Sequence, residues 1–513
     1  MKPRDLPVRP LVRPKRAWLA GACVTALALA GTARAEEPRK FGEPNVLSEP
    51  AEITQVVDAF DKDDLFDVHV SLGYQISFKK ADILRETQAV QNGLSTGGYL
   101  ANTLNVAEYK ESTSRLNARA DVGLYRDVAL VLRLPIILSN ERELNGLDGS
   151  AEVQSVVLQG APGEQLFSLP FKAPKRGGLE YLAIGVDAAL MNQHRDPASP
   201  TWLVGLEGRF NLGEPLRACN SSPVAGELKC ADPGDVDRNG VSAPDAGEGT
   251  FGGGERKSGV SRGVTALEFH TYASRRIKHI EPYAGFRALF EFPNASSAFG
   301  KSDLKGSLIN HPPLRGTLLV GLNVIPWEIR EQFQRMILDF RFSGTYVSEG
   351  RDYSELFDAL GSSHARSLRV PNYAEYQRNP NYNPANPNAA PQSIIDPNSR
   401  RAYFTGLTDV QAHGQYTLSA GFTWQAGEYV KFNLGGSYTL VQSHSLTGDQ
   451  ACNSDFTNSL DAAGPCRSSS GDGASATGIP NPNYRRTIND PGQRFRVANS
   501  SQLDAWLNAT VMF

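Results

Sequence analysis

The C-terminal stretch, residues 501–513, reads SQLDAWLNATVMF, and it decides the fold of this chain. Successive side chains of a β-strand point to opposite sides of it. In this stretch one side is entirely apolar and carries Leu503, Ala505, Leu507, Ala509, Val511 and Phe513. The other side is mixed and carries Gln502, Asp504, Trp506, Asn508, Thr510 and Met512. The stretch therefore predicts a strand with one face turned to an apolar environment.

The same alternation recurs upstream and predicts about twelve strands. In the first of them Val68, Val70, Leu72, Tyr74, Ile76 and Phe78 share a face. Pro135 removes a ladder donor in the third, so a bulge or a break is expected there. The predicted strands cover residues 67–78, 114–125, 128–138, 179–190, 201–212, 264–273, 280–292, 314–326, 335–347, 410–424, 430–440 and 501–513.

Long and short connections alternate along the chain. The predicted long loops are residues 79–111, 139–178, 213–262, 293–313, 348–407 and 441–500. An alternating strand that ends on Phe513 resembles the closing strand of a bacterial outer-membrane β-barrel. The resemblance implies an all-β fold, an antiparallel transmembrane barrel over residues 67–513, with short periplasmic turns and long extracellular loops. It also implies contact with membrane lipid and with the barrel-assembly machinery through the last strand. A soluble β-protein with a terminal edge strand is the alternative.

Tryptophan placement is a second indication of a barrel. Trp202, Trp327 and Trp424 fall beside the short turns, where rings with one polar edge would meet a membrane–water boundary. No run of about eighteen apolar residues follows residue 35, so no lasting membrane helix is expected. The net charge of −3 gives no basic footprint for nucleic acid.

Residues 1–35 have the pattern of a secretory signal peptide, with a basic start, an apolar stretch and the small-x-small sequence Ala33-Arg34-Ala35. Cys23 raises a lipoprotein as the alternative, but Ala20 stands where that signal usually has Leu. Residues 36–66 are expected to form a periplasmic segment, either a lead-in or a small plug. The predicted location is the cell outer membrane.

The cysteines beyond residue 35 occur as near neighbours in two polar segments. An oxidising compartment favours the local disulfides Cys219–Cys230 and Cys452–Cys466, although four free thiols are the alternative. Asp235, Asp237 and Asn239 resemble the first half of a Ca²⁺ loop, but Ala246 stands at its twelfth position. The expectation is therefore no cofactor, with a Ca²⁺ site in an outer loop as the alternative to a solvated turn.

The faces opposite the apolar ones should line the barrel interior, and they are rich in charge. The candidate lumen-lining residues are Arg115, Arg119, Arg133, Arg209, Arg287, Arg315, Arg335, Arg341, Asp187, Glu207 and Asp339. Two interpretations stay open for them. They form either a narrow hydrated pore that attracts anionic solutes or a neutralising salt-bridge network that fills the lumen.

The predicted function is a porin-like channel for small polar or anionic solutes. The alternative is a surface-binding or structural barrel with a plugged lumen, acting through its loops. Residues 348–407 contain a possible short helix at 353–360, and this loop would either constrict the pore or form an outer surface. A barrel hydrolase is a third possibility, because His69 and Ser71 share the inner face of the first strand. No partner motif accompanies them, so no enzyme is expected.

Overall fold

The computed structural model describes residues 51–59, 67–90, 99–147, 157–222, 230, 257–294, 297–299, 306–363, 365–369, 404–455, 466–468, 475–476 and 478–513. The predicted signal peptide and the candidate Ca²⁺ residues Asp235, Asp237 and Asn239 lie outside these residues. Among the described residues, no helix has the length and apolar character needed to cross a membrane.

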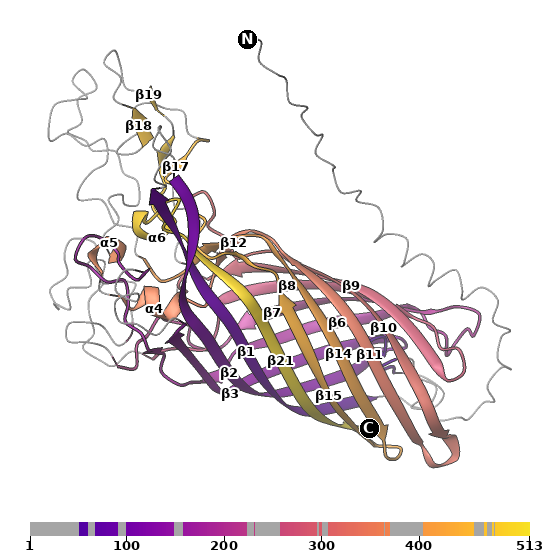
Figure 1. Cartoon of the computed structure of the whole chain (residues 1–513). Coiled ribbons are helices and arrows are strands. Elements are labelled where there is room, and N and C mark those ends of the chain that lie inside the picture. Colours follow the sequence, from indigo (N-terminus) through magenta and orange to yellow (C-terminus); the bar gives the residue numbers. More distant parts are fainter. Residues whose placement is uncertain are drawn as a thin grey trace, which may run out of the picture.

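Twelve antiparallel strands form a closed barrel (Figure 1). Closure is direct, because the first strand pairs with the last from His69 opposite Met512 to Arg85 opposite Phe495. The strands are β1 (Val68–Val90), β2 (Tyr99–Tyr125), β3 (Val128–Gly146), β6 (Tyr181–Met191), β7 (Thr201–Asn211), β8 (Val264–Ser274), β9 (Ile280–Pro293), β10 (Arg315–Ile329), β11 (Gln334–Val347), β14 (His413–Gln425), β15 (Val430–Val441) and β21 (Phe495–Met512). The predicted fold class and the role of the C-terminal strand are confirmed.

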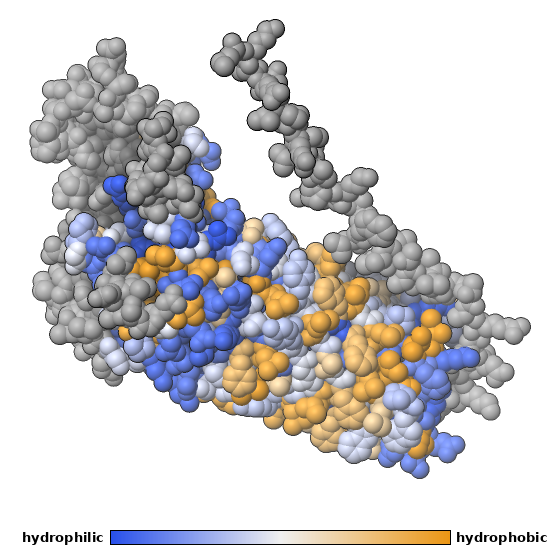
Figure 2. Space-filling view, viewed as in Figure 1, coloured by the Kyte–Doolittle hydropathy of each residue, from blue (hydrophilic) through white to orange (hydrophobic). Residues whose placement is uncertain are grey.

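The barrel exterior carries a band of exposed apolar side chains, as Figure 2 shows on one face. Leu318, Leu418 and Leu507 are 64%, 64% and 54% exposed, which would be unfavourable in water. Trp202, Trp327 and Trp424 are exposed beside the short turns, as predicted for an aromatic girdle. A closed barrel with an apolar outer band is the form in which strands can cross a bilayer, because every backbone polar group is paired within the sheet.

The strands on one side of the barrel are much longer than a membrane requires. A tilted membrane strand needs about 9–11 residues, whereas β1 has 23 residues and β2 has 27. The prediction of a loop at residues 79–111 was therefore wrong over most of its length. Beyond Phe78 the inward residues Ala81 and Ile83 become the buried ones, so the lipid-facing pattern ends while the strand continues.

Smaller elements lie between the barrel strands. They are β4 (Phe171–Lys172), β5 (Arg176–Leu179), η2 (Arg330–Gln332), β12 (Gly350–Asp352), α4 (Phe357–Gly361), α5 (Arg366–Arg369), β13 (Thr408–Val410), β16 (His444–Ser445), β17 (Cys452–Asn453), β18 (Arg467–Ser468), β19 (Ser475–Ala476), β20 (Ile479–Pro480) and α6 (Arg486–Asn489). The predicted strand 410–424 is interrupted, because Val410 pairs with β12 rather than with the barrel. The expected break at Pro135 is confirmed: β3 pairs with β6 up to Arg133 and with β5 from Ile136.

Most of these elements gather at the end of the barrel opposite the C-terminus (Figure 1). We call the described parts of the long connections the outer cap; they are residues 157–175, 212–222, 297–299, 306–314, 348–369, 404–412 and 442–494, with the gaps given above. We call residues 51–59, which lie at the short-turn end, the inner strap. Both contact the barrel interior, and they define the site described next.

Candidate functional site

The predicted lumen residues lie on the inward faces of their strands, opposite the exposed apolar side chains. Most of the arginines among them form ion pairs rather than standing free. These ion pairs are Arg115–Glu180 (3.2 Å), Arg119–Asp121 (2.8 Å), Arg133–Glu207 (3.3 Å), Arg209–Glu207 (2.9 Å), Arg315–Asp352 (3.1 Å) and Arg341–Asp339 (3.1 Å). These contacts favour the salt-bridge interpretation over a uniformly cationic pore.

Arg287, on the inward face of β9, differs from this pattern. Its side chain is exposed, and within the described part of the chain it has no ion-pair partner. Arg335 is buried, at 8% exposure, and Asp187 is held by His270, whose Nε2 lies 3.0 Å from Asp187 Oδ1. Gly205 makes room for this pair, because a Cβ there would lie 2.1 Å from the imidazole. The role of these residues in solute passage stays a prediction.

The inner strap crosses the lumen at the short-turn end. At one wall the Ala51 N–H donates to Glu281 Oε1 over 2.7 Å, and the Thr54 hydroxyl lies 2.8 Å from that of Ser274. At another wall Ala59 exchanges two backbone hydrogen bonds with Arg126 in the turn between β2 and β3. Between these anchors Lys431 donates to Gln55 Oε1 over 2.9 Å. The strap is therefore tied to several strands.

Four residues of the inner strap are buried, and Glu52 is exposed. Ala51, Thr54, Val57 and Ala59 are at most 4% exposed. A small polar cavity remains between the strap and the wall, lined by Glu52, Gln55, His69, Ser71, Arg119, Asp121, Asp187, Lys431 and Thr510. The strap thus lies across the inner mouth, anchored to the barrel wall. The sequence left open whether this segment is a lead-in or a plug.

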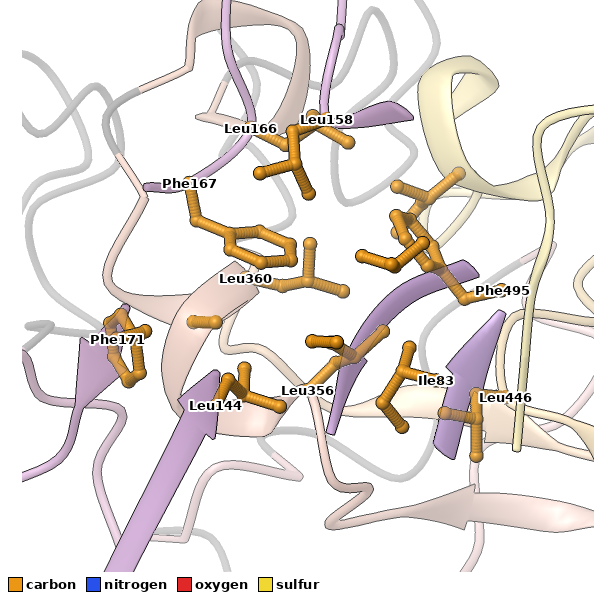
Figure 3. Close-up of a cluster of buried hydrophobic side chains, with 14 of the residues drawn as sticks. Ile83, Leu144, Leu158, Leu166, Phe167, Phe171, Leu356, Leu360, Leu446 and Phe495 are labelled. Atoms are coloured by element: carbon orange, nitrogen blue, oxygen red, sulfur yellow. The ribbon is translucent and has the colours of Figure 1, made fainter. Parts of the chain in front are cut away.

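The outer cap has a hydrophobic core of its own (Figure 3). Ile83 and Leu144 contribute from the long strands, Leu166 and Phe167 from the connection before β4, and Leu360 from α4. Burying such a side chain completely contributes about 1.5–3 kcal/mol. Because both the barrel wall and the loops contribute, the cap is packed into the outer mouth. The sequence left open whether residues 348–407 fold inward or outward, and their described part folds inward. Helix α4 overlaps the predicted helix at 353–360.

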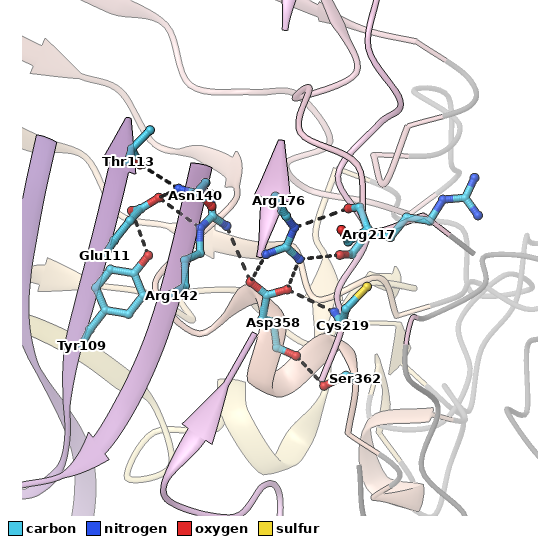
Figure 4. A network of polar contacts seen from close by, with 11 residues as sticks. Tyr109, Glu111, Thr113, Asn140, Arg142, Arg176, Arg217, Cys219, Asp358 and Ser362 are labelled. Carbon is cyan, nitrogen blue, oxygen red and sulfur yellow. Dashed lines mark hydrogen bonds and ion pairs between the residues drawn. The ribbon is translucent and has the colours of Figure 1, made fainter. Parts of the chain in front are cut away.

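A buried polar network fixes α4 to the barrel wall (Figure 4). Arg176 donates two hydrogen bonds to Asp358, at 3.2 and 2.5 Å, and Arg142 lies 3.6 Å from the same carboxylate. Arg142 also donates to Glu111 over 3.0 Å, so the network continues into β2. The Cys219 N–H donates to Asp358 as well. We call this set the Asp358 network, and nothing in the local sequence had indicated it.

Asp409 and His444 in the outer cap have shifted protonation equilibria. Burial, together with the neighbouring carboxylates Asp449 and Glu349, raises the pKa of Asp409 to about 8. Asp409 Oδ1 has no hydrogen-bond partner among the described residues. The rings of His413 and His444 stack with centroids 3.7 Å apart, and burial lowers the pKa of His444 to about 4. The stability of the cap is therefore expected to depend on pH.

Both predicted disulfides are present, Cys219–Cys230 and Cys452–Cys466. Among the residues the structure describes, no three His, Cys, Asp or Glu side chains form a group that could hold a metal ion. Ser71 was the candidate nucleophile for a hydrolase. Its hydroxyl lies 2.8 Å from the Thr510 hydroxyl, in a contact between two strands of the barrel wall that involves no base.

No protein-family model and no curated protein matches the sequence. Several solved structures are similar at low identity. An outer-membrane channel from Pseudomonas putida F1 aligns with a TM-score of 0.31 and 7% identity, over 86% of this chain and 96% of that one. A Pseudomonas aeruginosa FadL homologue aligns with a TM-score of 0.30 and 10% identity, over 91% and 93%. The outer membrane protease OmpT from Escherichia coli aligns with a TM-score of 0.25 and 7% identity, over 87% and 96%.

The strand pairing and the surface of the barrel define its fold. The first strand pairs with the last, the outer surface carries an apolar band, and the described parts of the long connections lie at one end (Figure 1). Together these features identify the chain as a bacterial outer-membrane β-barrel protein.

Proposed function

We propose that this protein is an outer-membrane channel for small polar solutes, held closed by the inner strap and the outer cap. The observation that carries the proposal is the partial exposure of charged side chains inside the barrel, between the two closures. The side chains of Arg115, Arg133 and Arg341 are 32%, 31% and 34% exposed, whereas that of Glu207 is 2% exposed. A lumen filled only by a structural network would bury all of these groups, so we infer a hydrated chamber.

The ion pairs limit the selectivity that such a chamber can have. Each paired arginine is neutralised locally, and Arg287 is the exposed cation that remains on the inward face of β9. A single unpaired charge attracts anions less strongly than a ring of charged side chains does. We therefore propose passage of small polar solutes with a modest preference for anions, and Arg287 as the residue that sets this preference.

The two closures act in series, so the tighter one limits conductance. The test records single channels in planar bilayers from four proteins: the full chain, a variant lacking residues 51–59, the Asp358→Asn variant, and the combination. We expect sparse, small steps from the full chain and large, frequent steps from the combination. The Asp196→Asn variant, altered on an exposed short turn, is the matched control and should behave like the full chain. A silent combination variant that still folds would refute the channel.

Selectivity is tested in the conducting combination. Arg287→Gln should move the reversal potential in a salt gradient toward that of a cation-preferring pore. Lys278→Gln removes a charge at a short turn and should leave the reversal potential unchanged. An unchanged potential in the Arg287 variant would remove this residue from the proposal.

A second candidate function has its own observation in support. The outer cap has a packed core and two disulfides, which is more order than a passive entrance needs. A barrel that presents this cap as a binding surface would give no conductance in any of the four proteins. That outcome would favour the surface-binding function.

A further inference from the structure

Two tyrosine rings lie against the inner wall of the barrel, on β8 and β9. Tyr272 of β8 is opposite Gly285 of β9, and a Cβ at Gly285 would lie 2.2 Å from Cδ1 of the ring. Tyr283 of β9 is opposite Gly321 of β10, and a Cβ at Gly321 would lie 2.2 Å from Cζ of that ring. Each ring therefore occupies the space over a glycine of the next strand, with one face toward the wall and the other toward the interior.

The two rings belong to an apolar patch inside the barrel. Tyr283 and Leu319 form a buried cluster with Ala51, and both Tyr272 and Ile53 pack against it. Ala51 and Ile53 belong to the inner strap, so the strap covers part of this patch. Tyr283 is 4% exposed, whereas Tyr272 is half-buried. The ring of Tyr272 is therefore the part of the patch that a solute in the lumen can reach.

Arg287 is the cation next to this ring. It follows Gly285 by two positions on the same inward face of β9, and it interacts electrostatically with Tyr272. Its side chain is exposed, and it has no ion-pair partner among the residues that the structure describes. A guanidinium is planar and presents its N–H donors as a fork that matches a carboxylate. A free fork of donors therefore stands beside an accessible aromatic ring.

The other charged groups around Tyr272 are paired with one another. Arg133, Arg341 and Glu268 also interact electrostatically with Tyr272. Each of these three has a partner of opposite charge on the inner wall: the pairs are Arg133–Glu207 (3.3 Å), Arg341–Asp339 (3.1 Å) and Glu268–Arg209. His270, which stacks with Tyr272, is held by Asp187 at 3.0 Å. The three ion pairs are neutral, so Arg287 supplies the single uncompensated charge beside the ring.

We propose that Arg287 and the open face of Tyr272 bind a monocarboxylate that is attached to an aromatic ring. This site rests on the proposed function, because it gives the channel its preferred class of anion. The guanidinium would donate two parallel hydrogen bonds to the carboxylate, and the ring of the ligand would stack on Tyr272. Two positions along a strand span about 7 Å, which is close to the separation between the ring of a bound benzoate and the guanidinium that holds its carboxylate. One uncompensated charge matches a monocarboxylate rather than a dianion.

The test titrates the full chain in detergent micelles with 4-fluorobenzoate and follows the fluorine resonance by NMR, with empty micelles as the blank. 4-Fluorobenzyl alcohol keeps the ring without the charge, and fluoroacetate keeps the charge without the ring. We expect saturable binding of 4-fluorobenzoate and at least about tenfold weaker binding of the other two. Arg287→Gln should lose at least about tenfold in affinity, because a charge-assisted pair of hydrogen bonds is removed. Tyr272→Leu should lose about two- to tenfold, the contribution of a stacked aromatic pair.

Two matched variants control for general effects of these substitutions. Tyr346→Leu makes the same replacement on the outer wall, where Tyr346 is 60% exposed, and Lys278→Gln removes a cation at a short turn. Both should bind 4-fluorobenzoate like the full chain, and heat-modified electrophoretic mobility confirms that each variant has formed the barrel. Equal binding of the alcohol, or full affinity in Arg287→Gln or Tyr272→Leu, would overturn the proposal.

Binding is measured without a current, so the outcome is separate from that of the channel recordings. A chain that conducts once its closures are removed but does not bind 4-fluorobenzoate would refute this site alone. A chain that binds 4-fluorobenzoate as expected but conducts in none of the four proteins would refute the channel and leave the binding site in place.

Discussion

We predict that the ion pair between Asp358 and Arg176 holds the outer cap in place. Asp358 is 4% exposed and Arg176 is 2% exposed, and two hydrogen bonds join them. The substitution Asp358→Asn keeps the size of the side chain but removes its charge. The guanidinium of Arg176 would then be buried opposite a neutral amide. Removing one partner of a buried ion pair costs about 3–5 kcal/mol, because the remaining charge stays desolvated.

This cost should appear as opening of the cap rather than unfolding of the barrel. A loss of 3–5 kcal/mol raises the open population by a factor of about 10² to 10³ or more. Hydrogen exchange reports such opening directly, since the protection of an amide falls with the free energy of local unfolding. We expect α4 and the neighbouring amides of residues 354–363 to lose protection by this factor. Amides in the middle of β10 and β11 should keep theirs.

The double variant Asp358→Asn with Arg176→Met separates loss of the pair from loss of a hydrogen-bonding side chain. Removing both charges should restore much of the protection, because no buried charge is left without a partner. The variant Asp196→Asn, on an exposed turn, should show the protection of the unaltered protein. Unchanged protection in Asp358→Asn would show that the packed core alone holds the cap, and the reasoning from the ion pair would be wrong.

Three further predictions concern the two closures. Phe495→Ala, in the core of the cap, should destabilise the cap by about 3–5 kcal/mol, seen as faster exchange around Phe167 with the barrel retained. Because the pKa of Asp409 is raised to about 8, the folded cap keeps a proton that the unfolded chain releases. The stability of the cap should therefore fall as the pH rises from about 4 to about 8. Asp409→Asn should flatten the dependence of hydrogen exchange on pH in that window, and an unchanged slope would contradict this prediction. Glu281→Ala removes the acceptor of the Ala51 N–H and should make residues 51–59 cleavable by added protease, whereas cleavage equal to that of the unaltered chain would count against this anchor.

The lipid-facing part of the barrel could be predicted from the sequence because lipid imposes one rule on every strand that it touches. Leu503, Leu507 and Val511 are exposed on the outside, as their alternation predicted. Asp504 and Thr510 lie on the inside and are buried. The inward placement of the candidate arginines followed from the same rule. The spacing of the cysteines was also sufficient to predict both disulfides, because the two partners of each disulfide are close in sequence.

The outer ends of the long strands could not be predicted in this way. Above the membrane, Lys80 and Lys110 face outward and Ile83 faces the cap. The apolar face has therefore changed sides, so a search for outward apolar residues ends at Phe78. The partners of Ile83 are Leu166, Leu360 and other residues far away in the sequence. No local pattern contains that information.

The sequence by itself determined that this chain forms a closed, membrane-spanning barrel, which strands it uses and which face of each strand meets lipid. The tertiary structure decided which segments lie in the two mouths of the barrel. It places residues 51–59 across one mouth and packs α4 into the other, through contacts such as Ala51–Glu281 and Arg176–Asp358. The physical reason is that lipid acts on each strand separately and leaves a periodic pattern, whereas these closures depend on single pairs of residues separated by long stretches of chain.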